Sequence, residues 1–248
     1  MERADQHAWP SPVEVLNPDG SSDIVLICEH ASNYIPESFN SLGLPAEELV
    51  RHIAWDVGAD GVSRALSKLL DAPCFLGKYS RLLIDLNRPV DSPTSIPELS
   101  EATPIPGNVG LGHEDREQRI NRIFEPFQRT VSDHLDARRQ KGLSTKIVAI
   151  HSFTPVFLGE RRPWHAGILF NKSSEFGRRI IDRLSQSTSL TIGANVPYVI
   201  ERSSDYAIPV HGEDRGHDAL LIEIRNDLIG SADGQTRWAK YLADSFEH

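Results

Sequence analysis

Two histidines stand at the ends of apolar, β-branched runs in the sequence. His30 ends the run that begins at Asp23, and His151 ends the run that begins at Lys146. Neutral imidazole is a common zinc ligand, and a catalytic zinc usually has three protein ligands and a water molecule. Either histidine alone is more simply a hydrogen-bonded packing residue. Two histidines in equivalent strand-end positions favour a shared metal site.

Asp56 is the third metal ligand that we expect. It stands where an apolar-rich segment breaks at Gly58, before the next predicted helix. An aspartate there is equally well explained as a helix N-cap. Glu29, next to His30, is a rival ligand, although strand alternation points neighbouring side chains to opposite faces.

A second group of polar residues flanks a predicted strand over 82–86. Arg81 precedes this strand, and Asn87 and Arg88 follow it. A guanidinium can hold a carboxylate through two parallel hydrogen bonds, which predicts recognition of a substrate carboxylate. Pairing with nearby acids such as Asp85 is the ordinary alternative. The segment 89–112 that follows is rich in Pro, Ser, Thr and Gly and is interpreted as a long binding loop or lid.

The apolar run over 219–225 carries Glu223 and Arg225 near its end. A carboxyl group in apolar surroundings should have a raised pKa unless it is paired, as a general base working near neutrality requires. The alternative is that Glu223 pairs with Arg225 or another cation. His211 and His217 bracket a charged loop before this run and rank lower as oxyanion-stabilising candidates.

Predicted strands and helices alternate along the whole chain. The remaining strands are predicted over 24–28, 74–76, 147–150, 167–170 and 220–224, and the helices after Gly58 and over 114–139, 175–184 and 236–246. This alternation predicts an α/β fold in which helices cover both faces of a mixed, largely parallel sheet. Ligands bind outside the carboxyl ends of the strands in such sheets, where the polar candidates stand. We expect a single domain over residues 1–248.

The composition narrows the class of protein. The chain has 248 residues and a formal net charge of −9, which argues against a general nucleic-acid binder. No apolar stretch has the length of a membrane span, and the start lacks a signal-peptide core, so we expect a cytoplasmic protein. Cys28 and Cys74 lie in apolar runs and are expected to be free thiols. The oligomeric state stays open.

Five segments together resemble the N-formylglutamate amidohydrolase family. They are Cys28-Glu-His-Ala-Ser-Asn33, Ala54-Trp-Asp-Val-Gly58, Ser80-Arg-Leu-Leu-Ile-Asp-Leu-Asn-Arg-Pro89, His151-Ser-Phe-Thr-Pro155 and Ile222-Glu-Ile-Arg-Asn226. The resemblance runs from about residue 23 to residue 228. It implies a three-layer αβα sandwich of the phosphorylase/hydrolase type, related to zinc carboxypeptidases. It also implies hydrolysis of a C–N amide bond in a small acidic N-acyl amino acid.

The resemblance also implies roles for individual residues. His30, Asp56 and His151 match the ligands of one divalent ion, which we expect to be zinc. Arg81, Asn87 and Arg88 match the groups that hold the substrate carboxylate, and Arg225 is expected beside them. Glu223 matches the glutamate that activates water.

Two departures from the family pattern indicate a divergent branch. The better-known deformylases read Pro-His-Ser-Gly after the first strand, where this chain reads Glu29-His-Ala-Ser32. They also place a histidine directly after the tryptophan, where this chain has Asp56. Formyl and glutamate therefore need not be its acyl group and amino acid. A related zinc exopeptidase or amidase for another acyl amino acid or short peptide is one alternative. A catalytically silent carboxylate-binding protein of the same fold is another.

Overall fold

The computed structural model of the chain describes residues 9–246 and is built around a seven-stranded sheet. The strands follow the order β1-β3-β2-β6-β11-β9-β10 across the sheet. Their bounds are β1 (Val13–Leu16), β2 (Ile24–Cys28), β3 (Cys74–Gly77), β6 (Lys146–Phe153), β9 (Ala166–Leu169), β10 (Ile192–Ala194) and β11 (Asp218–Arg225). Strands β3, β2, β6 and β11 are parallel, whereas β1 pairs antiparallel with β3 and β9 pairs antiparallel with β11. The sheet is therefore mixed, with a parallel centre, as the alternation predicts.

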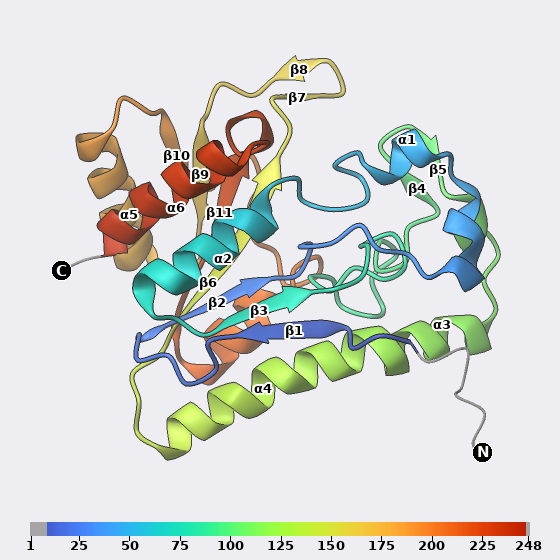
Figure 1. Cartoon of the computed structure of the whole chain (residues 1–248), viewed down its shortest axis with the longest axis horizontal. Helices are drawn as coiled ribbons and strands as arrows, with labels where there is room; N and C mark the ends of the chain where they lie inside the picture. The colour runs from blue at the N-terminus through green and yellow to red at the C-terminus, as the bar shows by residue number, and fades with distance from the viewer. Residues whose placement is uncertain (1–8, 247–248) are drawn as a thin grey trace.

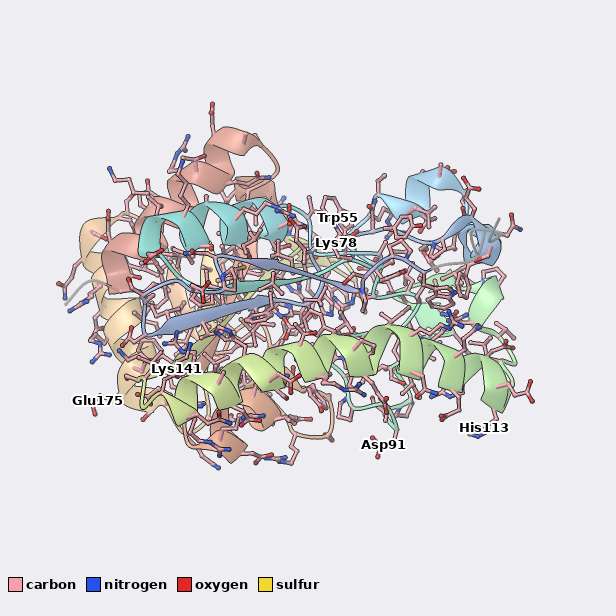
Figure 2. The ribbon with its side chains drawn as sticks, turned by 60° about the horizontal axis from the view of Figure 1, so that its bottom comes forward. Trp55, Lys78, Asp91, His113, Lys141 and Glu175 are labelled. Atoms are coloured by element: carbon pink, nitrogen blue, oxygen red, sulfur yellow. The ribbon has the colours of Figure 1, made fainter. Side chains whose placement is uncertain are left out.

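Helices cover both faces of the sheet and complete the three layers (Figure 1). One face carries α2 (Ala59–Leu70), α5 (Ser174–Ser187) and α6 (Ala232–Phe246), and the other carries α4 (Glu125–Gln140). In Figure 2, α4 crosses the front of the molecule, with Lys141 near one end and His113 at the start of α3 (His113–Arg119) beyond the other. The predicted α/β sandwich is confirmed. Within residues 9–246, no helix combines the length and the apolar character needed to cross a membrane.

The central strands are apolar throughout because both of their faces are buried. In β2, Leu26 packs into the core under α2, α5 and α6, whereas Val25 and Ile27 pack into the core under α4. Parallel strands covered on both faces read as continuous hydrophobic runs for this reason. Cys28 and Cys74 are buried free thiols, as expected.

The predicted strand over 82–86 is wrong. Residues 81–83 form a turn in which Leu83 N–H bonds to Ser80 O at 3.0 Å, and the side chain of Ser80 accepts from Leu82 N–H at 3.2 Å. The leucines are nevertheless buried, because they pack into the core beneath α4 and not into the sheet. An apolar run in a sequence indicates that its residues are buried, and a buried turn gives the same apolar pattern as a buried strand.

The predicted long helix over 114–139 is present but has a wide turn within it. It consists of α3, a π-helical segment η3 (Ile120–Phe124) and α4. Pro126 lies in the first turn of α4, where its missing N–H is least costly. The helix thus accommodates the proline with one widened turn, which precedes the proline in the sequence.

Short elements complete the chain. They are α1 (Ala46–Leu49), two hairpins made of β4 (Leu99–Ser100) with β5 (Thr103–Pro104) and of β7 (Val156–Phe157) with β8 (Glu160–Arg161), the π-helical η4 (Ala207–Gly212), and the 3-10 segments η1 (Glu37–Gly43), η2 (Pro106–Asn108), η5 (Glu213–Arg215) and η6 (Asn226–Leu228). The predicted loop over 89–112 therefore contains a small hairpin. The hairpin of β7 and β8 was not predicted from the sequence.

Candidate active site

Two glutamate side chains and one histidine side chain lie in one row near the ends of the central strands. The parallel ladders place Ile27 of β2 opposite Ala149 of β6, and Glu223 of β11 opposite His151 of β6. Glu29 lies directly after the end of β2, and its Oε2 is 3.0 Å from His151 Nε2. The register of β6 and β11 therefore places His151 beside Glu223, and the turn after β2 brings Glu29 to His151.

His30 and Asp56 join this row from the segments that follow β2 and precede α2. Strand β2 ends at Cys28, and His30 lies in the turn beyond it. The Asp56 N–H donates to His30 O at 3.0 Å, which ties the two segments together. Gly58, at a φ of 84°, is the N-cap of α2, so Asp56 does not have the N-cap role considered from the sequence.

The three predicted metal ligands converge. One ligand atom from each of His30, Asp56 and His151 lies within 4.8 Å of the other two, and all three residues are buried. Asp56 Oδ2 is 2.9 Å from His151 Nδ1 and 3.4 Å from His30 Nδ1. Two imidazole nitrogens and one carboxylate form a ligand set typical of catalytic zinc sites, which leave one position open. These residues could therefore hold a metal ion.

The outer nitrogens of both imidazoles face further buried carboxylates. His30 Nε2 lies 2.7 Å from Asp85 Oδ1, and His151 Nε2 lies 3.0 Å from Glu29 Oε2. Burial by itself would raise the pKa of Asp56, but the neighbouring imidazoles outweigh it and hold this pKa well below its usual range. Asp56 is thus an ionised carboxylate, as a metal ligand must be.

Glu223 has the opposite electrostatic setting. The residue is 6% exposed, and its Oε2 has no hydrogen-bond partner among residues 9–246. Burial raises the pKa of Glu223 to about 7, with the negative charge of Asp56 adding to the rise and the positive charge of His151 opposing it. Neither Arg225 nor any other cation forms an ion pair with Glu223 in the described part of the chain. Such a carboxyl group can exchange protons near neutral pH.

Arg81 is already engaged by carboxylates. Its Nη2 and Nε lie 2.6 and 3.0 Å from Asp85 Oδ2, and its Nη1 lies 3.3 Å from Asp56 Oδ1. Arg81 therefore balances the charges of the buried acids around the ligand cluster. This pairing was the ordinary alternative considered from the sequence.

Arg88 and Asn87 lie on the wall of the same cavity. Arg88 donates to Ser204 O, and the carboxylate nearest to it in the described chain is Asp85, at 3.9 Å. Asn87 Oδ1 accepts the backbone N–H groups of Tyr206 and Ala207 at 3.0 and 2.9 Å. Arg88 thus has donor capacity left for a ligand, whereas the amide oxygen of Asn87 holds the segment before η4.

Three other candidates lie outside the cavity. The Arg225 guanidinium lies 2.8 Å from Asp227 and also donates to Trp164 O. His211 is buried beside α4 with its Nε2 2.7 Å from Gln128 Oε1, and burial lowers its pKa to about 4. His217 is half-buried and does not line the cavity either.

The ligand cluster opens into a cavity of about 680 Å³. Glu223, Arg81 and Arg88 line it, and Thr94 contributes from the long loop after Pro89. The cavity is also lined by residues that the sequence reasoning missed, which include His52, Phe157, Asn195, Tyr198, Glu201 and Asp205. These residues lie in short loops and in a small hairpin, so no periodic pattern marks them.

The aromatic part of this wall is held together by Arg162. Its guanidinium carbon lies 4.6 Å from the ring centre of Phe157 and 4.9 Å from that of Tyr198, and its Nη1 donates to Tyr198 Oη at 2.9 Å. It also lies 5.8 Å from the ring of Phe153. Arg162 therefore joins the β7–β8 hairpin to the loop after β10.

Comparisons with known proteins show the family and the fold of the chain. The family model of N-formylglutamate amidohydrolase matches residues 22–230. A solved structure of the gene product Atu2144 from Agrobacterium tumefaciens has 37% identity and a TM-score of 0.91, covering 94% of this chain and 92% of that chain. N-formylglutamate amidohydrolase from Ralstonia eutropha JMP134 has the same fold, with 16% identity, a TM-score of 0.70 and 95% coverage of each chain. No curated protein matches the sequence.

Proposed function

The chain belongs to the N-formylglutamate amidohydrolase family and is thus a hydrolase of amide bonds, and we propose that it is zinc-dependent and cleaves a small N-acyl amino acid. The observation that carries the proposal is the convergence of His30, Asp56 and His151 within 4.8 Å, beside the buried Glu223.

His30, Asp56 and His151 would hold the metal ion. Both imidazoles face Asp56 through Nδ1, and their Nε2 atoms are anchored on other carboxylates, so the three ligand atoms are already oriented toward one position. A zinc ion held there would act as a Lewis acid toward the amide carbonyl and make a water molecule more acidic. The residues present fit this ion in number, type and burial.

Glu223 is the proposed general base and general acid. Burial raises the pKa of Glu223 to about 7 in the metal-free site, and a carboxyl group poised near neutrality would accept a proton from the attacking water at its unpartnered Oε2. The same oxygen then delivers the proton to the amide nitrogen as the C–N bond breaks. The products are a carboxylic acid and a free amino acid.

Arg88 is the proposed anchor for the substrate carboxylate. It lines the cavity, and no carboxylate of the described chain lies within 3.5 Å of its guanidinium. Asn87 supports this role indirectly, because it fixes the segment on which Ser204 and Asp205 stand. Arg81, predicted from the sequence to share the carboxylate, is proposed instead to keep its charge beside Asp56 and the scissile amide.

Metal analysis and turnover of the purified enzyme test this function. The protein is incubated with zinc, freed of excess metal and assayed with N-formyl and N-acetyl derivatives of glutamate, aspartate and leucine. We expect one zinc per chain and release of free amino acid from at least one of these substrates. His151→Ala should lose both metal and turnover. Retention of one equivalent of zinc by that variant would refute the ligand assignment, and carboxylate binding without turnover would indicate a silent binding protein.

A further inference from the structure

Each ligand imidazole lies between the shared carboxylate of Asp56 and a carboxylate of its own. His30 has Asp56 on Nδ1 and Asp85 on Nε2. His151 has Asp56 on Nδ1, at 2.9 Å, and Glu29 on Nε2, at 3.0 Å. The two rings stand nearly perpendicular, with an interplanar angle of 89°. In both imidazoles, therefore, Nδ1 faces the ligand cluster and Nε2 faces away from it.

The two outer carboxylates differ in how they are stabilised. Asp85 receives two hydrogen bonds from Arg81 and the backbone N–H of Asn87 in addition to His30. Glu29 is 1% exposed, and its only ion-pair partner among residues 9–246 is His151. Its Oε1 has no hydrogen-bond partner in the same part of the chain. Burial of a carboxylate with a single partner is costly, so the contact with His151 needs a functional explanation.

Glu29 is not placed to be a metal ligand itself, which the sequence had left open. The group of ligand atoms within 4.8 Å of one another contains His30, Asp56 and His151 but not Glu29. Glu29 Oε2 faces Nε2 of His151, whereas the cluster is on the Nδ1 side of the same ring. The imidazole therefore separates Glu29 from the position of the ion.

We propose that Glu29 is a positioning residue, which holds His151 with Nδ1 toward the metal ion and strengthens it as a ligand. An imidazole that gives Nδ1 to a metal carries its proton on Nε2, and Glu29 Oε2 accepts that proton in a hydrogen bond. Such a bond selects one tautomer, fixes the plane of the ring and makes the ligating nitrogen more basic. The pairing of β2 with β6 ends at Ile27 and Ala149, and the turn that follows β2 brings Glu29 to His151. This inference rests on the proposed metal site and adds a residue outside the ligand set.

Zinc affinity of Glu29→Gln tests the proposal without use of the enzyme assay. The wild-type protein and the variant are stripped of metal and titrated with zinc in competition with a chromophoric chelator. We expect affinity to fall about 10- to 100-fold, the usual effect of mutating the hydrogen-bonded partner of a ligating histidine, because a neutral amide oxygen accepts from Nε2–H more weakly than a carboxylate and makes the ligating nitrogen less basic. The glutamine keeps the size of the side chain, and circular dichroism with a thermal melt of the metal-free proteins verifies the fold.

Asp205→Asn is the matched control. Asp205 lines the same cavity, and within residues 9–246 its side-chain hydrogen bonds go to Asn87, Ser204 and the Glu201 N–H and not to an imidazole. The Asp205→Asn variant loses the same charge from the site as Glu29→Gln. If the orientation of His151 determines the zinc affinity, the affinity of Asp205→Asn should stay within about twofold of that of the wild type. An equal loss in both variants would mean that Glu29 acts only through net charge, and this outcome would overturn the proposal.

Failure of the inference is separable from failure of the proposed function. Absence of zinc binding by the wild-type protein would refute the metal site and, with it, the role of Glu29. Tight zinc binding by both the wild type and Glu29→Gln would refute the positioning role and leave the metal site intact. If Glu29→Gln does not fold, Glu29→Asp provides the test. This variant keeps the charge but shortens the side chain by one methylene, which moves the carboxylate oxygen away from His151. Unchanged affinity in Glu29→Asp would also overturn the proposal, and we expect a loss.

Discussion

At the scale of single residues, two carboxyl groups of the site differ in their surroundings. Asp56 contacts both imidazoles, which hold its pKa below the usual range despite burial. Glu223 lies at the side, where burial raises its pKa to about 7. Two acids whose pKa values are pushed apart can take different roles at one pH, one as a ligand and the other as a proton carrier. This difference supports the roles proposed for Asp56 and Glu223.

Glu223→Gln should therefore separate chemistry from metal binding. We expect kcat to fall by at least about 100-fold, because the amide cannot accept a proton from water. Zinc content should not change, since Glu223 is not in the ligand group. Steady-state kinetics and metal analysis of the same preparation measure both. A variant with full metal and wild-type kcat would assign the base to another residue.

Arg88→Gln should weaken substrate binding more than turnover. Charge-assisted hydrogen bonds to a carboxylate contribute about 1.5–3 kcal/mol, so KM should rise by roughly 10- to 100-fold with a small change in kcat. An N-acyl amine that lacks the carboxylate is the control substrate. It should be hydrolysed equally by the wild type and the variant. An equal KM increase for this substrate would contradict the role of Arg88 as a carboxylate anchor.

At the scale of elements, one wall of the cavity depends on two short segments that are not in the main core. The β7–β8 hairpin supplies Phe157, and the loop after β10 supplies Tyr198. This loop packs closely on β9, where a Cβ added to Gly167 would lie 1.5 Å from Val196 O. Glycine is thus required at 167 for the loop to reach the cavity. Arg162 then joins the hairpin to the loop through Tyr198.

Arg162→Gln should loosen this wall, and Arg161→Gln is its matched control. Loss of the cation–π contacts, each worth about 0.5–2 kcal/mol, should raise KM about fivefold with little change in kcat if the wall contacts the substrate. Arg161 is the exposed neighbour in β8, so its substitution removes the same charge and should leave KM unchanged. Equal KM values in the two variants would show that Arg162 does not shape the site.

At the scale of the whole molecule, buried ionisable groups link the fold to pH. His211 lies in the core beside α4 and is neutral there, because burial lowers its pKa from 6.5 to about 4. The hydrogen bond between its Nε2–H and Gln128 Oε1 suits the neutral form. Since the unfolded chain binds a proton at higher pH than the folded chain, stability from this group is lost as pH falls from 6.5 towards 4.

His211→Gln should reduce this pH dependence. We expect the metal-free wild type to lose about 2–3 kcal/mol more than the variant in free energy of unfolding between neutral pH and pH near 4.5, as about two pKa units imply. Urea unfolding of both proteins at the two pH values measures the difference. The variant will be less stable at neutral pH, because it disturbs the core. The test is the change with pH, and equal changes in both proteins would contradict the pKa shift of His211.

The sequence by itself determined the α/β class and the metal-ligand candidates. Continuous apolar runs signal strands buried on both faces, and polar residues at their ends signal a site, because carboxyl ends of parallel strands share one edge of the sheet. His30 and His151 followed from that rule, Asp56 followed from its place before a helix and from the family resemblance, and the structure brings the three together. Local pattern and strand polarity suffice for this much.

Only the tertiary structure decided the partners of these residues. Folding or a turn brings together the segments that make three of these contacts. They are the pairing of Arg81 with Asp85, the contact of Glu29 with His151 and the contact of Arg162 with the aromatic wall of the cavity. The run over 82–86 turned out to be a buried turn because burial, and not strand geometry, sets its apolar pattern. Side-chain partners depend on strand register and loop packing, and local periodicity in the sequence determines neither of them.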